Sequence, residues 1–171
     1  NMLGRAHLEA GALQPGQEPV DVGEVIASTL SRDTDLLSEH EIEMLIEPDL
    51  PMPLLDDVLL EQALFNILDN AGKYTNPETK ITVMASSDAG SLLIHVRDQG
   101  EGFAVSDPEV AFDKFKRFKS ADRSRPGTGL GLAISRGFIE AMGGTIVARN
   151  RQDRSGAELI MTFPLNEKNT K

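Results

Sequence analysis

The spacing of apolar residues divides the chain into helical and extended segments. Apolar residues three and four positions apart predict helices over 3–13, from Asp21 to about Leu37, from Asp56 or Asp57 to about Tyr74, and from Gly129 to Met142. Alternation of polar and apolar residues predicts strands over 41–46, 80–86, 91–98, 145–150 and 157–163. Helices and mainly antiparallel strands in this order predict an α+β two-layer sandwich, with a mixed, largely antiparallel sheet covered by helices on one face.

The segments between these elements carry their own signals. Asp88-Ala89-Gly90 is a hairpin signal between two predicted strands, and Pro15 to Pro19 is expected to be a linker. Gln99 to Gly127 is rich in glycine and charge and fits neither pattern, so it is expected to be mostly irregular. A segment of that length inside a compact domain is usually a lid or disordered.

Composition narrows the class of protein. The chain has 171 residues and a net charge of −10, which suits one domain with a short appendage and argues against a general nucleic-acid binder. The absence of cysteine excludes disulfides, thiolate nucleophiles and cysteine-ligated zinc. No apolar run approaches the roughly 18 residues that a membrane span requires, and no signal segment opens the chain.

One segment reverses the overall charge. Between 111 and 127 six side chains are basic and two are acidic. Such a basic segment in an acidic protein indicates either a local anionic partner or a solvated loop, and charge alone does not decide between them.

The helix predicted to end near Tyr74 carries an unusual polar stripe, Asn66, Asn70 and Lys73. At about 100° per residue these three lie within an arc of about 60°, opposite the apolar face. Asparagine is unfavourable inside helices. Amide oxygens can ligate Mg²⁺, and a lysine ammonium can bind phosphate beside it. The alternative is a solvated helix face.

Two glycine motifs add to this stripe. Asp98-Gln99-Gly100-Glu101-Gly102 follows a predicted strand, so a carboxylate and a closely approaching backbone could meet a ligand there, although an ordinary turn has the same pattern. Gly127-Thr128-Gly129-Leu130-Gly131-Leu132 opens a helix, where free N–H groups bind anions, although it could be only a hinge. It is neither a Rossmann fingerprint nor a P-loop. Together with the stripe, these motifs predict a nucleoside triphosphate site with a metal.

With these motifs the chain resembles a known family, the catalytic and ATP-binding domains of bacterial sensor histidine kinases, which have the Bergerat (GHKL) fold. Four motifs in order carry the resemblance, over about Pro19 to Leu165: Asn66 to Thr75, Asp98 to Gly102, Phe112-Asp113-Lys114-Phe115, and Gly127 to Ile134. The lid and the run Gly143-Gly144-Thr145-Ile146 look most like the potassium-responsive KdpD branch.

The resemblance implies roles at the matching positions. Asn66 and Asn70 would ligate Mg²⁺, and Asn66 and Lys73 would act in catalysis. Asp98 would accept a hydrogen bond from the exocyclic amine of adenine. The other implied nucleotide-binding residues lie around the base, the lid and the phosphates: Tyr74, Gly100, Gly102, Phe112, Phe115, Arg117, Gly127, Thr128, Gly129, Leu130 and Gly131. Phe112 and Phe115 would anchor the lid and dock the phosphoacceptor helices, and Arg117 is the weaker phosphate candidate.

The resemblance also implies an organisation and partners. Residues 1–16 would end the dimerisation and phosphoacceptor hairpin, 17–166 would form the catalytic domain, and 167–171 a polar tail. The γ-phosphoryl group of ATP would pass to a histidine on the separate dimerisation domain, and from there to a response regulator. The expected setting is a cytoplasmic domain, not itself inserted in a membrane, of a homodimeric, membrane-anchored bacterial kinase. The fragment alone is not expected to autophosphorylate.

The histidines of this chain are poor acceptor candidates. His40-Glu41 superficially resembles the start of a phosphoacceptor motif, but a strand pattern follows it instead of the motif's basic residue, Ser or Thr, and Pro on a helix. His7 has no motif context, and His95 is expected to be structural.

Two other functions remain open: a nucleotide-sensing module without kinase activity, and an ATP-hydrolysing relative. Hydrolysing members of the fold carry a glutamate one helical turn before the second asparagine, whereas this chain has Asn66, whose amide cannot act as a base.

Overall fold

The computed structural model describes residues 14–33, 38–73, 75–103, 108–112 and 131–165. A five-stranded sheet contains β2 (Glu41–Ile46), β4 (Lys80–Asp88), β5 (Ser91–Arg97), β6 (Thr145–Asn150) and β7 (Ala157–Pro164). Its strand order is β2-β4-β5-β7-β6, in which β2 and β4 are parallel and every other neighbouring pair is antiparallel. The predicted mixed, largely antiparallel sheet is confirmed.

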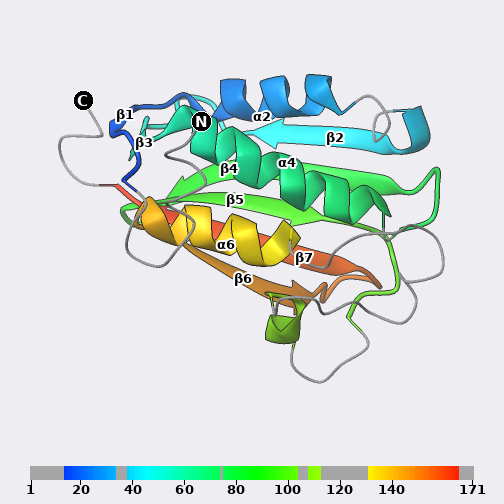
Figure 1. Ribbon diagram of the computed structural model, residues 1–171. Coiled ribbons are helices and arrows are strands. Elements are labelled where there is room, and N and C mark those ends of the chain that lie inside the picture. The colour runs from blue at the N-terminus through cyan, green and yellow to red at the C-terminus, as the bar shows by residue number, and fades with distance from the viewer. Residues whose placement is uncertain (1–13, 34–37, 74, 104–107, 113–130, 166–171) are drawn as a thin grey trace.

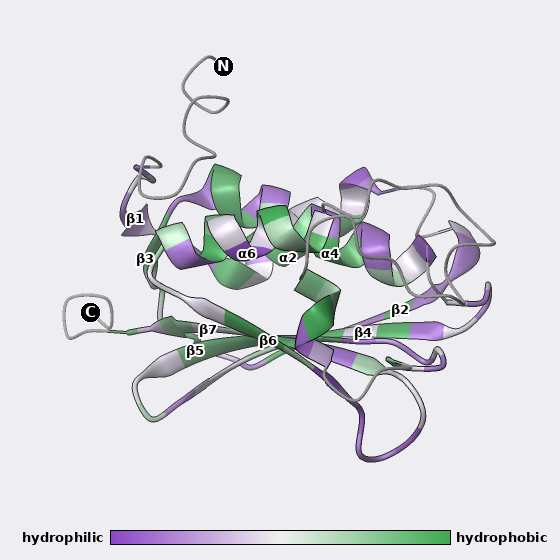
Figure 2. Ribbon diagram, turned by 60° about the horizontal axis from the view of Figure 1, so that its bottom comes forward, coloured by the Kyte–Doolittle hydropathy of each residue, from purple (hydrophilic) through white to green (hydrophobic). Residues whose placement is uncertain are grey.

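In the part of the chain that the structure describes, three helices cover one face of this sheet: α2 (Val22–Arg32), α4 (Asp57–Lys73) and α6 (Gly131–Ala141). Figure 2 shows that their apolar sides face the sheet, with the polar sides outward. The buried side chains from α4 and the central strands form the core: Leu60, Leu64, Ile67, Leu68, Ile81, Val83, Leu92, Ile94, Met161 and Phe163. The two-layer sandwich expected from the sequence is therefore the observed architecture.

The starts of α2 and α4 are those that the sequence predicts. Asp21 caps α2, because its side chain accepts a hydrogen bond from the backbone N–H of Glu24. Asp56 caps α4 in the same way, with Oδ1 accepting from the N–H groups of Val58 and Leu59, each at 3.1 Å.

The expected end of the helix that begins at Asp21 was wrong. α2 ends at Arg32 rather than near Leu37, because Asp33 leaves the helical region (φ −99°, ψ 75°) and its N–H bonds to the carbonyl of Leu30. Aspartate competes with helical hydrogen bonding and so favours helix ends. The end of α4 at Lys73 lies one residue before the expected Tyr74, which is outside the described residues.

The predicted hairpin between β4 and β5 closes in a two-residue turn. Ala89 and Gly90 both have positive φ, at 52° and 84°, as a type I′ turn requires. Pairing of Asp88 with Ser91 extends β4 two residues beyond its expected end. This tight closure fixes the register of β5, which ends one residue before Asp98.

Three short pieces were missed. β1 (Glu18–Pro19), in the expected linker, pairs antiparallel with β3 (Leu54–Leu55). The 3₁₀ helix η1 (Pro108–Phe112) lies in the segment expected to be irregular. Such short elements depend on tertiary contacts rather than on a repeating pattern. The predicted helix over 3–13 lies outside the described residues.

Candidate functional site

Asp98 stands just beyond β5, at the carboxyl end of a central strand. Its Oδ1 accepts hydrogen bonds from the N–H of Gly100 at 2.9 Å and of Ala157 at 3.0 Å, and its own N–H donates to the carbonyl of Ala157. Within the described part of the chain, no hydrogen bond reaches Oδ2. One carboxylate oxygen is thus fixed by the protein, and the other is available to a ligand.

Burial raises the pKa of the Asp98 carboxyl, because removal from water disfavours its charged form. The two backbone hydrogen bonds and the guanidinium of Arg151 act in the opposite direction. A desolvated carboxylate with a free oxygen makes strong hydrogen bonds to a polar ligand group.

The loop after Asp98 lies against the end of β6. Gly102 has φ +84°, and a Cβ there would lie 2.6 Å from Oδ1 of Asn150. Asn150 holds this loop by accepting from the N–H of Phe103 at 2.6 Å and donating to its carbonyl at 3.2 Å. The structure thus gives Gly102 a packing requirement, whereas the predicted role of Gly100 and Gly102 beside a base stays a prediction.

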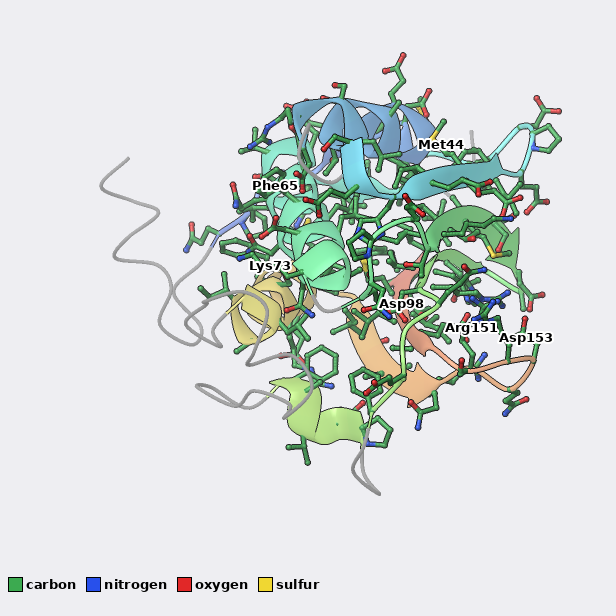
Figure 3. The ribbon with its side chains drawn as sticks, turned by 90° about the vertical axis from the view of Figure 1, so that its right-hand side faces the viewer. Met44, Phe65, Lys73, Asp98, Arg151 and Asp153 are labelled. Atoms are coloured by element: carbon green, nitrogen blue, oxygen red, sulfur yellow. The ribbon has the colours of Figure 1, made fainter. Side chains whose placement is uncertain are left out.

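The polar stripe of Asn66, Asn70 and Lys73 lies on α4, with all three residues partly accessible. The side chains are loosely held. Gln62 Nε2 lies 3.5 Å from Oδ1 of Asn66, and Nζ of Lys73 forms an ion pair with Oδ2 of Asp69 at 3.0 Å. Figure 3 shows Lys73 at the end of α4 and Asp98 beyond it toward the sheet.

The fit of a metal can be judged from the donor set. Among the described residues, no group of three or more histidine, cysteine or acidic side chains could hold a metal ion. Asn66 and Asn70 offer two neutral oxygen ligands one helical turn apart. Such a set suits Mg²⁺, which commonly takes only one or two protein ligands and completes its shell with phosphate oxygens and water.

Two further predicted site residues flank the segment 113–130. Phe112, in η1, is buried, and its ring centre lies 3.9 Å from the guanidinium carbon of Arg136 on α6. Gly131 opens α6, and a Cβ there would meet nothing within 4 Å. The structure therefore gives Gly131 no packing requirement, and its phosphate role stays a prediction.

The remaining predicted site residues lie outside the described residues: Tyr74, Phe115, Arg117, Gly127, Thr128, Gly129 and Leu130.

The described histidines are engaged within the fold. The ring nitrogens of His40 lie 3.1 Å from the carbonyl of Gly72 and 3.2 Å from that of Thr79, which joins the end of α4 to the start of β4. Nδ1 of His95 lies 2.8 Å from the buried carboxylate of Glu158. The contact of His95 agrees with its expected structural role, whereas the absence of a phosphoacceptor role at His40 stays a prediction.

Four residues near Asp98 were not singled out in the sequence: Asn150, Arg151, Asp153 and Gly156. They belong to β6 and the β6–β7 turn, more than fifty positions from Asp98 in the chain, and match no motif. Only the pairing of β5 with β7 brings them to the site.

In the part of the chain that the structure describes, no helix is long and apolar enough to cross a membrane.

Comparison with known proteins agrees with this geometry. The sequence profile described as "Histidine kinase-, DNA gyrase B-, and HSP90-like ATPase" matches residues 55–167. The sensor protein KdpD of Escherichia coli strain K12 is 34% identical over 168 residues, which are 96% of this chain and 18% of KdpD. ArcB of the same strain, an aerobic respiration control sensor protein, is 29% identical over 91% of this chain and 21% of its own length.

Solved structures show the same fold. The mycobacterial sensor histidine kinase MprB superposes with a TM-score of 0.74 at 30% identity, over 86% of this chain and 97% of that one. Full-length ShkA in complex with AMPPNP gives a TM-score of 0.78 at 29% identity, over 93% of this chain and 33% of that one. The chain spans about a fifth of the length of the curated relatives named above. The chain therefore belongs to the histidine kinase-, DNA gyrase B- and HSP90-like ATPase family, as an ATP-binding domain of the sensor histidine kinase type.

Proposed function

We propose that this domain binds ATP with Mg²⁺ and presents the γ-phosphoryl group to a histidine on the dimerisation domain of the same kinase. The observation that carries the proposal is Asp98, a partly buried carboxylate with one oxygen fixed by two backbone N–H groups and the other left for a ligand. The exocyclic amine of adenine is a donor that suits this oxygen. The related solved structure of ShkA is a complex with AMPPNP.

The phosphate end of the site is assigned to the polar stripe. Asn66 and Asn70 would hold Mg²⁺, which would neutralise phosphate charge and orient the chain of phosphates. Lys73 would exchange its carboxylate partner Asp69 for a phosphate oxygen. The glycine-rich start of α6, with Gly131 as its described residue, would direct backbone N–H groups toward the same anion.

This arrangement suits phosphoryl transfer by positioning and electrostatics. The neutral imidazole of the acceptor attacks the γ-phosphorus with the lone pair of its unprotonated nitrogen. An N–P bond forms, the bond from phosphorus to the β–γ bridging oxygen breaks, and ADP leaves. No strong base is needed for this attack, which agrees with an amide at Asn66 where a hydrolase would need a carboxylate.

The partners follow from the same assignment. We assign residues 1–16 to the end of the phosphoacceptor hairpin, 17–166 to the catalytic domain and 167–171 to a tail. The full-length protein would be a homodimeric sensor kinase of the KdpD type, anchored in the bacterial membrane with this domain in the cytoplasm. Its phosphohistidine would supply a response regulator.

A transfer assay tests the proposal. The domain is mixed with Mg²⁺, γ-labelled ATP and the separately purified dimerisation domain of its own full-length kinase. We expect acid-labile label on the acceptor histidine, and none on this domain alone. Confirmed ATP binding without label on the acceptor would favour a nucleotide-sensing module. Steady phosphate release by this domain alone, abolished by Asn66→Ala, would favour a hydrolase.

A further inference from the structure

Arg151 makes an unusual set of contacts directly behind Asp98. It is the first residue after β6, and its side chain is only 11% exposed. Nε and Nη2 bind both carboxylate oxygens of Asp153, at 3.0 and 2.8 Å, while Nη1 donates to the backbone carbonyl of Asp98 at 3.0 Å. Figure 3 shows Asp98, Arg151 and Asp153 in this order from the middle of the molecule outward. Asp153 thereby holds the guanidinium on its outer side, and Nη1 points at the Asp98 backbone.

The turn between β6 and β7 is shaped to bring this arginine to its place. Gly156 has φ +143°, and a Cβ there would lie 2.2 Å from the Asp98 carbonyl oxygen and 2.9 Å from Cδ of Arg151. The N–H of Arg151 donates to the carbonyl of Gly156 at 2.8 Å. A side chain at position 156 would push the turn away from Asp98, so the close approach depends on this glycine.

These contacts complete the immobilisation of Asp98. Ala157 binds its N–H and its Oδ1, and Arg151 binds its carbonyl, so backbone and side chain are fixed from the same hairpin. A planar guanidinium held by a bidentate carboxylate loses little further freedom when it makes its remaining hydrogen bond. Small displacements of a recognition group cost affinity, so supporting contacts of this kind determine how well a site discriminates.

We propose that Arg151, held by Asp153, is a positioning residue that fixes Asp98 for recognition of the 6-amino group of adenine. The inference rests on the proposed function, because it takes Asp98 to be the group that reads the base. Arg151 itself touches no nucleotide in this assignment. It acts on base selectivity and leaves the phosphate end of the site unchanged.

Base selectivity provides a direct readout. The affinities of the domain for ATP and for purine riboside 5′-triphosphate, which lacks the 6-amino group, are measured by titration calorimetry with Mg²⁺. We expect the wild type to prefer ATP by tenfold or more. In Arg151→Met this preference should fall at least fivefold, while the affinity for the analogue changes less than twofold. A merely structural role would lower both affinities together.

The same turn offers a matched control. Arg154 is exposed, and among the described residues its Nε donates only to the adjacent carbonyl of Ser155, so Arg154→Met removes an equal charge without touching Asp98. It should keep the wild-type preference for ATP. Arg151→Lys can supply one donor but no bidentate fork, so it should restore part of the preference lost in Arg151→Met.

A second variant decides the question if Arg151→Met does not fold. Asp153 has a side chain 61% exposed, so Asp153→Asn should fold normally while weakening the grip on Arg151. We expect a two- to fivefold loss of ATP preference. An unchanged preference in the folded Arg151 and Asp153 variants, or an equal loss for both nucleotides, overturns the inference. If the wild type shows no preference for ATP, the assignment of Asp98 in the proposed function fails first, and the inference fails with it.

Discussion

Asp98 at the end of β5 and the polar stripe of Asn66, Asn70 and Lys73 on α4 are held in different ways. The structure gives Asp98 three hydrogen bonds to Gly100 and Ala157 and a fourth, through its carbonyl, to Arg151. Among the described residues, the stripe has one hydrogen bond of 3.5 Å and one ion pair whose side chains are about one-third exposed. The proposed base end of the site is therefore held in place before a ligand arrives, while the proposed phosphate end can adapt.

This difference suits the two kinds of recognition. A base is neutral and is identified by where its few donors and acceptors lie, so the protein must fix its own group in advance. Phosphates and Mg²⁺ carry large charges, and their strong attraction to polar side chains can reorder loosely held groups on binding. We infer that geometry gives selectivity at the base end and that charge gives affinity at the phosphate end.

The largest effect is expected from Asp98→Asn. The amide oxygen can still accept from Gly100 and Ala157, but Nδ2 replaces the free carboxylate oxygen and presents a donor to the donor amine of adenine. We expect roughly a 100-fold loss of ATP affinity, as for a lost hydrogen bond to a charged group. Calorimetric titration measures this loss. An ATP affinity within threefold of wild type would remove Asp98 from the base end.

The same variant should leave the fold intact or make it more stable. Burial raises the pKa of Asp98 in the folded state, so folding favours the protonated carboxyl. The contribution of this group to stability falls as pH rises from the unfolded pKa through the folded pKa. The asparagine variant lacks that loss, so its stability relative to wild type should increase with pH over this window. Urea denaturation at pH 4 and pH 7 measures the difference.

The base end could be predicted from the sequence only in part. An aspartate after a strand, followed by two glycines, indicated Asp98, because a local pattern carried that information. The turn residues Arg151 and Gly156 could not be found, since their role depends on the register of β5 with β7. The asparagines of α4 could be singled out as candidates because helical periodicity places them on one face regardless of tertiary contacts. Local patterns thus predicted the groups proposed to face the ligand, but not those that hold them.

The fold, too, could be predicted from the sequence only in part. The sheet and its covering helices follow from periodicity and capping, which Asp21 and Asp56 show directly. The pairing of β1 with β3 does not, because it joins segments that are distant in the chain. The end of α2 at Arg32 is set locally at Asp33, whereas the apolar spacing continues to Leu37 and so predicted a longer helix.

An intermediate effect is expected from Asn70→Ala at the phosphate end. Loss of one amide ligand should weaken ATP binding with Mg²⁺ by roughly tenfold, while binding measured in EDTA should change little. Stability should also change little, because the structure gives the Asn70 side chain no hydrogen bond within the described residues. A metal titration at fixed ATP measures this. If affinity fell equally with and without Mg²⁺, Asn70 would contact the nucleotide rather than the metal.

The smallest effect is expected from Asp69→Asn, which tests how free the phosphate end is. Nζ of Lys73 now lies 3.0 Å from Asp69 Oδ2, and both side chains are about one-third exposed. Such a pair is worth at most about 1 kcal/mol, so releasing Lys73 should raise ATP affinity by no more than about fivefold. The gain should shrink with added salt, and the preference for ATP over purine riboside triphosphate should not change. Lys73→Met, as the matched control, should lower the affinity for both nucleotides. If Asp69→Asn also lowered both, the carboxylate would be orienting Lys73 toward the phosphates, and the phosphate end would be preorganised like the base end.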